Sequence, residues 1–167
     1  SNWMIERAIT IDGQAWTTDE LALQVALHPQ IPGSLTISGT QVQSASNYSS
    51  IVLTLSFIPG TGTFPLGVNQ GTTPGGSGSV VVVAGSSFTH YTTPLSGNAG
   101  TVTITTLTGS RMAGSFTFTA PPSLGGGADV NVTNGEFDIA LPAGFLAATG
   151  NNRGSTMSAT IGGQPWV

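Results

Sequence analysis

The sequence contains no cysteine and no lysine, and these two absences exclude several kinds of site. Without cysteine there is no disulfide framework, no thiolate metal site and no cysteine nucleophile. Three arginines stand against seven acidic residues, which gives a formal net charge of −4. So few cations cannot neutralise a run of phosphates, and no basic patch favours an anionic membrane. We therefore expect no nucleic-acid partner.

Long apolar runs are missing as well. The longest, Val80–Ala84, is far shorter than the roughly 18 residues of a membrane span, and no basic start followed by an apolar stretch indicates a signal peptide. We expect no membrane insertion and, for a secreted protein, the mature form. Only 6% of residues are charged while 38% are apolar, which leaves a surface of Ser, Thr, Asn, Gln and Gly. With little charge to keep copies apart, this surface favours an extracellular or cell-surface domain.

Glycine and proline are abundant, at 24 and 10 residues, and they separate short runs rich in Val, Ile, Thr and Phe. This pattern predicts an all-β fold, an antiparallel β sandwich or barrel of about ten short strands. The expected strands are Ala8–Ile11, Leu21–Leu27, Ser34–Ser38, Ile51–Ile58, Thr63–Leu66, Ser79–Ala84, Ser87–Thr92, Thr101–Leu107, Ser115–Ala120, Val130–Thr133, Glu136–Leu141 and Ser158–Ile161.

Turn chemistry predicts how several of these strands connect. Asp12-Gly13 and Asn134-Gly135 are dipeptides that accept positive φ at both central positions of a type I′ turn, so we expect a hairpin at each. The glycine-rich composition predicts loops at Gly67–Gly78, Pro121–Gly127 and Ala147–Thr156. The run Val80–Val83 is prone to recruit other strands at an open edge, so we expect it in a central strand or paired with a neighbouring subunit.

A short repeat is the most informative feature of the chain. Ile11-Asp-Gly-Gln-Ala-Trp16 returns as Ile161-Gly-Gly-Gln-Pro-Trp166, offset by 150 residues. A fixed period indicates repeated units. We therefore divide the chain into an N-terminal arm (1–7), a single β domain (8–157) and a C-terminal strand (158–167) that duplicates the start of the domain.

This repeat predicts an assembly interface at the two ends of the chain. The expected interface residues are Trp3, Met4, Ile5, Ile161, Gln164 and Trp166. The terminal segment begins the next unit of a tandem polypeptide, augments the sheet of a separate subunit, or resembles the first hairpin by coincidence. The sequence leaves these three alternatives open.

The second half of the chain resembles a known family. Gly100–Leu107, Met112–Ala120 and Val130–Phe137 follow one another in order, together with Ile11–Trp16 and Gly62–Gly67, in an arrangement similar to a family of bacterial exported β domains. Its members are typically lipoproteins or surface proteins, sometimes with domains in tandem, and their function is unassigned. The resemblance implies export and an all-β domain, and it supplies no catalytic residues.

Candidate chemistry elsewhere is sparse. Glu136 and Asp138 share a strand face, and paired carboxylates are what glycoside hydrolysis needs, but we favour a solvated strand face that follows the Asn134-Gly135 turn. His28 and His90 are isolated, and no motif for a nucleophile, metal or cofactor appears. We therefore expect no enzyme and no cofactor, but a structural domain of a fibre, filament or repetitive cell-surface protein that assembles head-to-tail with copies of itself. The alternative is a carbohydrate-binding module that uses exposed aromatic residues such as Tyr48 or Tyr91 on a polysaccharide.

Overall fold

The structure is a computed structural model, and it describes residues 9–16, 18, 24–28, 30–67, 73–124, 126–145, 159–161 and 164–166. In these residues the fold is all-β, and no helix is long and apolar enough to cross a membrane. The strands are β1 (Ile9–Ile11), β2 (Gln14–Trp16), β3 (Gln24–Leu27), β4 (Leu35–Ser44), β5 (Asn47–Ser56), β6 (Gly62–Leu66), β7 (Gly75–Ala84), β8 (Ser87–Thr92), β9 (Gly100–Leu107), β10 (Arg111–Ala120), β11 (Val130–Ala140), β12 (Ala159–Ile161) and β13 (Gln164–Trp166).

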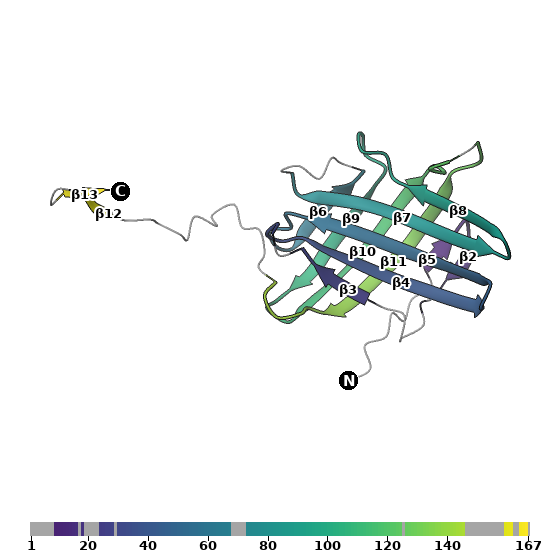
Figure 1. The fold of residues 1–167 in the computed structure, drawn as a ribbon, viewed down its shortest axis with the longest axis horizontal. Helices are drawn as coiled ribbons and strands as arrows, with labels where there is room; N and C mark the ends of the chain where they lie inside the picture. The colour runs from purple at the N-terminus through teal and green to yellow at the C-terminus, as the bar shows by residue number, and fades with distance from the viewer. Residues whose placement is uncertain are drawn as a thin grey trace.

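Eleven of these strands form one sheet. Its order is β2-β1-β11-β10-β9-β6-β7-β5-β4-β3, with β8 paired to β7 outside this path. In Figure 1 the strands β4, β5 and β7 cross over β9, β10 and β11, so the sheet is folded into two layers that face each other. All pairings are antiparallel except the short contact of β6 with β7. The expected antiparallel all-β architecture is confirmed.

Strand alternation builds the core between the two layers. Val102 and Ile104 on β9 point inward and are buried, whereas Thr101, Thr103 and Thr105 on the same strand face outward. The facing layer contributes buried leucines and isoleucines of β4 and β5 in the same alternating way. Apolar faces covered on one side only are the expected result of a period of two.

One predicted hairpin is wrong. Asn134-Gly135 does not connect two strands but lies inside β11, where the register to β10 shifts between Phe116 and Phe118. Asn134 has φ 53°, so the positive φ that this dipeptide tolerates serves a β-bulge here instead of a turn. A Cβ at position 135 would lie 2.5 Å from the ring of Phe116, so a larger residue there requires this ring to move.

The predicted loop at Gly67–Gly78 is also partly wrong, because its last four residues open β7. Close packing explains these glycines: a Cβ on Gly76 would lie 2.1 Å from the carbonyl oxygen of Thr54, and one on Gly78 would lie 2.7 Å from the Phe118 ring. The strand β7 is central, between β5 and β8, as the run of valines predicted. The predicted loop at Ala147–Thr156 lies outside the described residues.

Candidate assembly site

The β1–β2 hairpin forms the first half of the candidate site. Ile11 pairs with Gln14 across the two-residue turn, in which Asp12 and Gly13 have φ of 49° and 79°. These values match the predicted type I′ turn. On its other side β1 pairs with β11, Thr10 opposite Thr133 and Ile11 opposite Val132, so the hairpin extends the large sheet beyond β11.

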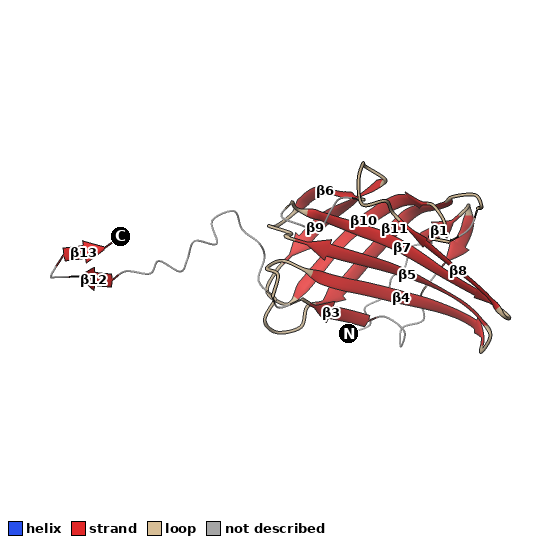
Figure 2. Cartoon of the chain, turned by 45° about the horizontal axis from the view of Figure 1, so that its top comes forward, coloured by secondary structure: helices blue, strands red, loops and turns tan. Residues whose placement is uncertain are grey.

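Trp16 anchors this hairpin in the core. The side chain is only 4% exposed, and its Nε1 donates a hydrogen bond of 2.8 Å to the Oγ of Ser49. Ser49 belongs to β5, which lies in the opposite layer (Figure 2). The hydrogen bond between Trp16 and Ser49 therefore joins the two layers. A Cβ on Gly39 of β4 would lie 3.3 Å from the Trp16 ring, which shows how closely the ring approaches that strand.

Polar contacts fix the hairpin at three further points. The backbone N–H of Asp12 donates to the carbonyl of Asn131 and its Oδ1 accepts from the N–H of Asn131, both at 2.8 Å. Thr10 and Thr133 are joined through their hydroxyl groups. Beyond the hairpin, the Oγ1 of Thr18 accepts from the N–H of Thr40 at 3.0 Å. The hairpin therefore connects β11 of one layer with β4 and β5 of the other.

The β12–β13 hairpin repeats this backbone pairing. Ala159 pairs with Trp166, Thr160 with Pro165 and Ile161 with Gln164, each pair 150 residues after its equivalent in β1–β2. In the described part of the chain these two strands form a sheet of their own, with no pairing to the large sheet. The same local pairing thus occurs once within the body and once apart from it.

The repeat preserves the residues that carry the docking. Thr10 contacts Thr133, Ile11 packs against the core and Trp16 fills the space between the layers. All three reappear, as Thr160, Ile161 and Trp166. Two hairpins can resemble each other by chance in their turn and strand residues. Such a coincidence gives no reason for the residues that contact β11 and the core to be the same as well.

Proline at position 165 distinguishes the two edges of the second hairpin. In a two-residue hairpin the closing pair exchanges both hydrogen bonds, so the N–H of the next residue, Ala15 in β2, points away from β1. Pro165 has no N–H at the equivalent place, which removes a donor from the outer edge of β13. The edge of β12 is equivalent to the edge by which β1 joins β11, and within the described residues it pairs with no further strand.

The predicted interface residues fall into two groups. Trp3, Met4 and Ile5 lie outside the described residues. Ile161 and Gln164 are cross-strand partners in the second hairpin, and Trp166 closes its far end. Sequence reasoning missed Ser49 and Asn131, which hold the first hairpin. Only the alternation of β5, where Ser49 continues the inward positions of Ile51 and Leu53, pointed to Ser49.

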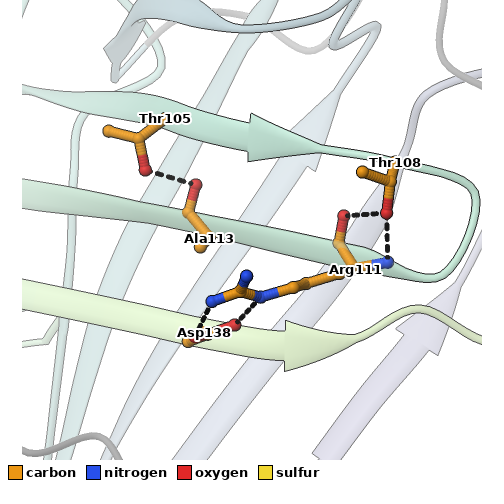
Figure 3. Close-up of polar contacts among 5 residues, drawn as sticks. All are labelled: Thr105, Thr108, Arg111, Ala113 and Asp138. Atoms are coloured by element: carbon orange, nitrogen blue, oxygen red, sulfur yellow. Dashed lines mark hydrogen bonds and ion pairs between the residues drawn. The ribbon is translucent and has the colours of Figure 1, made fainter.

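The two carboxylates that share a face of β11, Glu136 and Asp138, differ in their contacts, because Asp138 forms an ion pair with Arg111. Arg111 on β10 donates to both carboxylate oxygens of Asp138 on β11, with 2.7 Å between Nε and Oδ1 (Figure 3). These hydrogen bonds hold the pKa of Asp138 below its ordinary value against a small opposing effect of burial, and they raise the pKa of Arg111. The ion pair therefore favours the charged form of Asp138.

Glu136 lies on the same outer face, next to a hollow of about 620 Å³ that opens between hydroxyl groups. Its lining side chains include Thr101, Thr103, Ser115, Thr117, Asn134 and Glu136. Asp138 is not among them, so one carboxylate of the predicted pair lines the hollow, whereas a glycosidase needs two carboxyl groups in different roles. Among the described residues no group of three or more His, Cys, Asp or Glu side chains is placed to hold a metal ion.

Comparison with protein families gives a match over most of the chain. A family model described as "Domain of unknown function (DUF6252)" matches residues 8–139, which contain the strands from β1 nearly to the end of β11. The matched segment stops before the second hairpin. No curated protein sequence and no solved structure matched the chain.

Proposed function

The chain belongs to this family of domains of unknown function, DUF6252, and for this member we propose the role of a non-enzymatic structural unit, repeated along a polypeptide and assembled end to end outside the cell or on its surface. In this proposal β12–β13 is the opening hairpin of the following unit. The partners of the chain are then further copies of the same fold.

One observation carries the proposal: the second hairpin keeps the pairing and the docking side chains of the first. Its register is identical at an offset of 150 residues, and Thr160, Ile161 and Trp166 stand where Thr10, Ile11 and Trp16 contact the body. A segment with these residues is suited to a body like that of β3–β11. Within this chain the corresponding position is already filled.

The occupied position favours a tandem arrangement over strand exchange. Trp16 is buried between the layers and hydrogen-bonded to Ser49, so a hairpin from another copy has to expel it before it can dock. Truncation of a buried tryptophan to alanine costs about 3–5 kcal/mol, which indicates how strongly the resident Trp16 competes with Trp166 for this position. In a tandem polypeptide each body receives the hairpin that precedes it, and nothing is displaced.

The path of the chain supports an end-to-end arrangement. The hairpin β1–β2 lies near one end of the layered body, whereas the end of β11, from which the chain continues to Phe145, lies near the other (Figures 1 and 2). Units linked through residues 146–158 then follow one another along a line. The low charge of the surface supports close contact between neighbours over a wide range of salt concentration.

A concatenated protein tests the proposal. The chain is made as residues 1–166 followed directly by residues 17–145, so that β12–β13 is supplied with a body of its own. We expect two folded units, and an unfolding enthalpy about twice that of the single unit, because this enthalpy scales with the number of folded residues. Calorimetry and limited proteolysis measure both properties.

The matched control for the concatenated protein carries Trp166→Ala. We expect the second unit alone to lose about 3–5 kcal/mol of stability, so that two separate transitions appear. A second unit that stays unfolded in the parent protein, or whose stability does not change with Trp166→Ala, contradicts the proposed role of β12–β13.

A further inference from the structure

A row of apolar side chains crosses four neighbouring strands on the outer face of the β4–β5–β7–β8 layer. Val42 on β4 pairs with Tyr48 on β5, Tyr48 pairs with Val83 on β7, and Val83 pairs with Phe88 on β8. Directly paired residues project from the same face of a sheet. We call these four residues the apolar row; Val42 is 53% exposed, Tyr48 36% and Phe88 65%.

The two tyrosines of the chain differ in their environment. Tyr91 pairs with Val80, whose side chain is fully buried, and it packs against the core from the inner face of β8. It is therefore not the exposed platform that the sequence predicted. Tyr48 belongs to the apolar row on the outer face, together with Phe88, which sequence reasoning did not single out.

The surroundings of the apolar row are mainly polar. The next row along the same strands is Thr40, Ser50, Val81 and His90. The five strands β3, β4, β5, β7 and β8 contain no aspartate, glutamate, lysine or arginine. A charged partner gains nothing from such a face, so the charge pattern favours a neutral ligand with both apolar and hydrogen-bonding groups.

The size of the apolar row favours a small or thread-like ligand over a protein. Aromatic side chains present about 150–250 Å² each, so the row exposes on the order of a few hundred Å². A stable protein interface buries about 800 Å² on each partner. A second copy of the chain therefore needs much more contact than the row offers, whereas a ligand stacked on two rings does not.

The spacing of the two strands that carry these rings favours one ligand class. Tyr48 and Phe88 lie on strands that flank β7, and two strand spacings amount to about 10 Å. This is close to the length of the disaccharide repeat in an extended β-1,4-linked glycan, whose sugar rings have apolar C–H faces and equatorial hydroxyl groups. We infer that the apolar row is a binding site for a single neutral glycan chain, which stacks on Tyr48 and Phe88.

The polar neighbours complete the site. Thr40 and Ser50 are joined by a hydrogen bond of 2.8 Å between their hydroxyl groups, one row away from Val42 and Tyr48. His90 lies on the same face, one row from Phe88, and its Nδ1 is 3.2 Å from the Oγ of Ser123. These groups are positioned to bond the sugar hydroxyls that project sideways from a stacked chain. The site lies on the outer face of its layer, whereas Trp16 is buried between the layers, so the site does not depend on the tandem arrangement. Thr40 contacts both, through its backbone N–H to Thr18 and through its hydroxyl group to Ser50.

Titration with defined oligosaccharides tests the site. The probes are the linear β-1,4-linked hexasaccharides of glucose, xylose and mannose, each titrated into the full chain by calorimetry, with backbone amide shifts recorded by NMR. We expect at least one probe to bind saturably and to shift amides of residues 40–50 and 81–90. Tyr48→Ser and Phe88→Ser are each expected to weaken that binding at least about tenfold, which corresponds to 1.4 kcal/mol.

Leu124→Ser is the matched control, because Leu124 is 87% exposed but lies outside the apolar row. We expect it to leave the binding unchanged, and thermal unfolding of all three variants to match that of the parent. Absence of saturable binding for all three probes overturns the inference. Binding that survives both substitutions in the row also overturns it, as does a concentration-dependent dimer that Phe88→Ser dissolves, since the occupant is then a second copy.

Discussion

The two hairpins of this chain have nearly the same sequence and the same pairing, but different surroundings. In β1–β2 the first strand is hydrogen-bonded to β11 and Trp16 is buried between two layers. In β12–β13 the strands pair only with each other within the described residues. The comparison shows that the local sequence is sufficient to define a hairpin and its register, whereas the body decides whether the hairpin becomes part of a core.

The largest expected effect separates the two tryptophans. Trp16→Ala is expected to lower the free energy of unfolding by about 3–5 kcal/mol, because it leaves a cavity between the layers. It also removes the donor to Ser49. Trp166→Ala in the same chain is expected to leave the unfolding of the large sheet unchanged, as measured by urea denaturation. Equal destabilisation by both substitutions would show that the second hairpin docks on the body that carries it.

An intermediate effect tests whether the two hairpins are interchangeable. The variant with Ile9→Ala, Asp12→Gly and Ala15→Pro gives β1–β2 the sequence of β12–β13. We expect it to fold with a loss of about 1–2 kcal/mol, mainly because the hydrogen bond from Asn131 to Asp12 is lost. The loss of stability is measured from the urea midpoint of unfolding of this variant, which is compared with the midpoint of Trp16→Ala. A variant as unstable as Trp16→Ala would refute the equivalence.

The smallest expected effect concerns β11, at the end of this strand that is remote from its pairing with β1. Arg111 lowers the pKa of Asp138, so this ion pair stabilises the fold above the pKa of the unfolded carboxyl, about 3.9, and the contribution disappears as the pH falls through the lower folded value. We expect Asp138→Asn to reduce the acid dependence of the urea midpoint only slightly, because both side chains of the pair are partly exposed and solvent weakens their interaction. We expect the pairing of β1 with β11 to stay intact, as measured by amide hydrogen exchange. If the substitution leaves the acid dependence unchanged, the ion pair does not contribute to the pH dependence of stability.

Two similar turn dipeptides show how much of the fold is readable from the sequence. Asp12-Gly13 and Asn134-Gly135 both have a first residue at positive φ, as their side chains allow. Only the first makes the predicted hairpin, whereas the second makes a bulge in β11. The local backbone conformation was predictable. The course of the strand was not, because β10 pairs with residues on both sides of Asn134 and so keeps β11 continuous.

The candidate site was predictable to a similar extent. The repeat pointed to Ile161, Gln164 and Trp166 without any structural information. The partners of the equivalent first hairpin, Ser49 and Asn131, lie 33 and 119 residues away along the chain from the residues that they contact. No local pattern identifies such partners.

The sequence by itself determined the all-β class, the face to which most strand residues point and the register of both terminal hairpins. These properties depend on a side-chain period of two and on the φ angles of single residues, which are local. Only the tertiary structure decided that the layers close around Trp16, that β7 begins with glycines packed against Thr54 and Phe118, and that Tyr48 and Phe88 share a row. Each of these depends on which strands become neighbours, and that choice is made by burying apolar surface contributed by residues far apart in the chain.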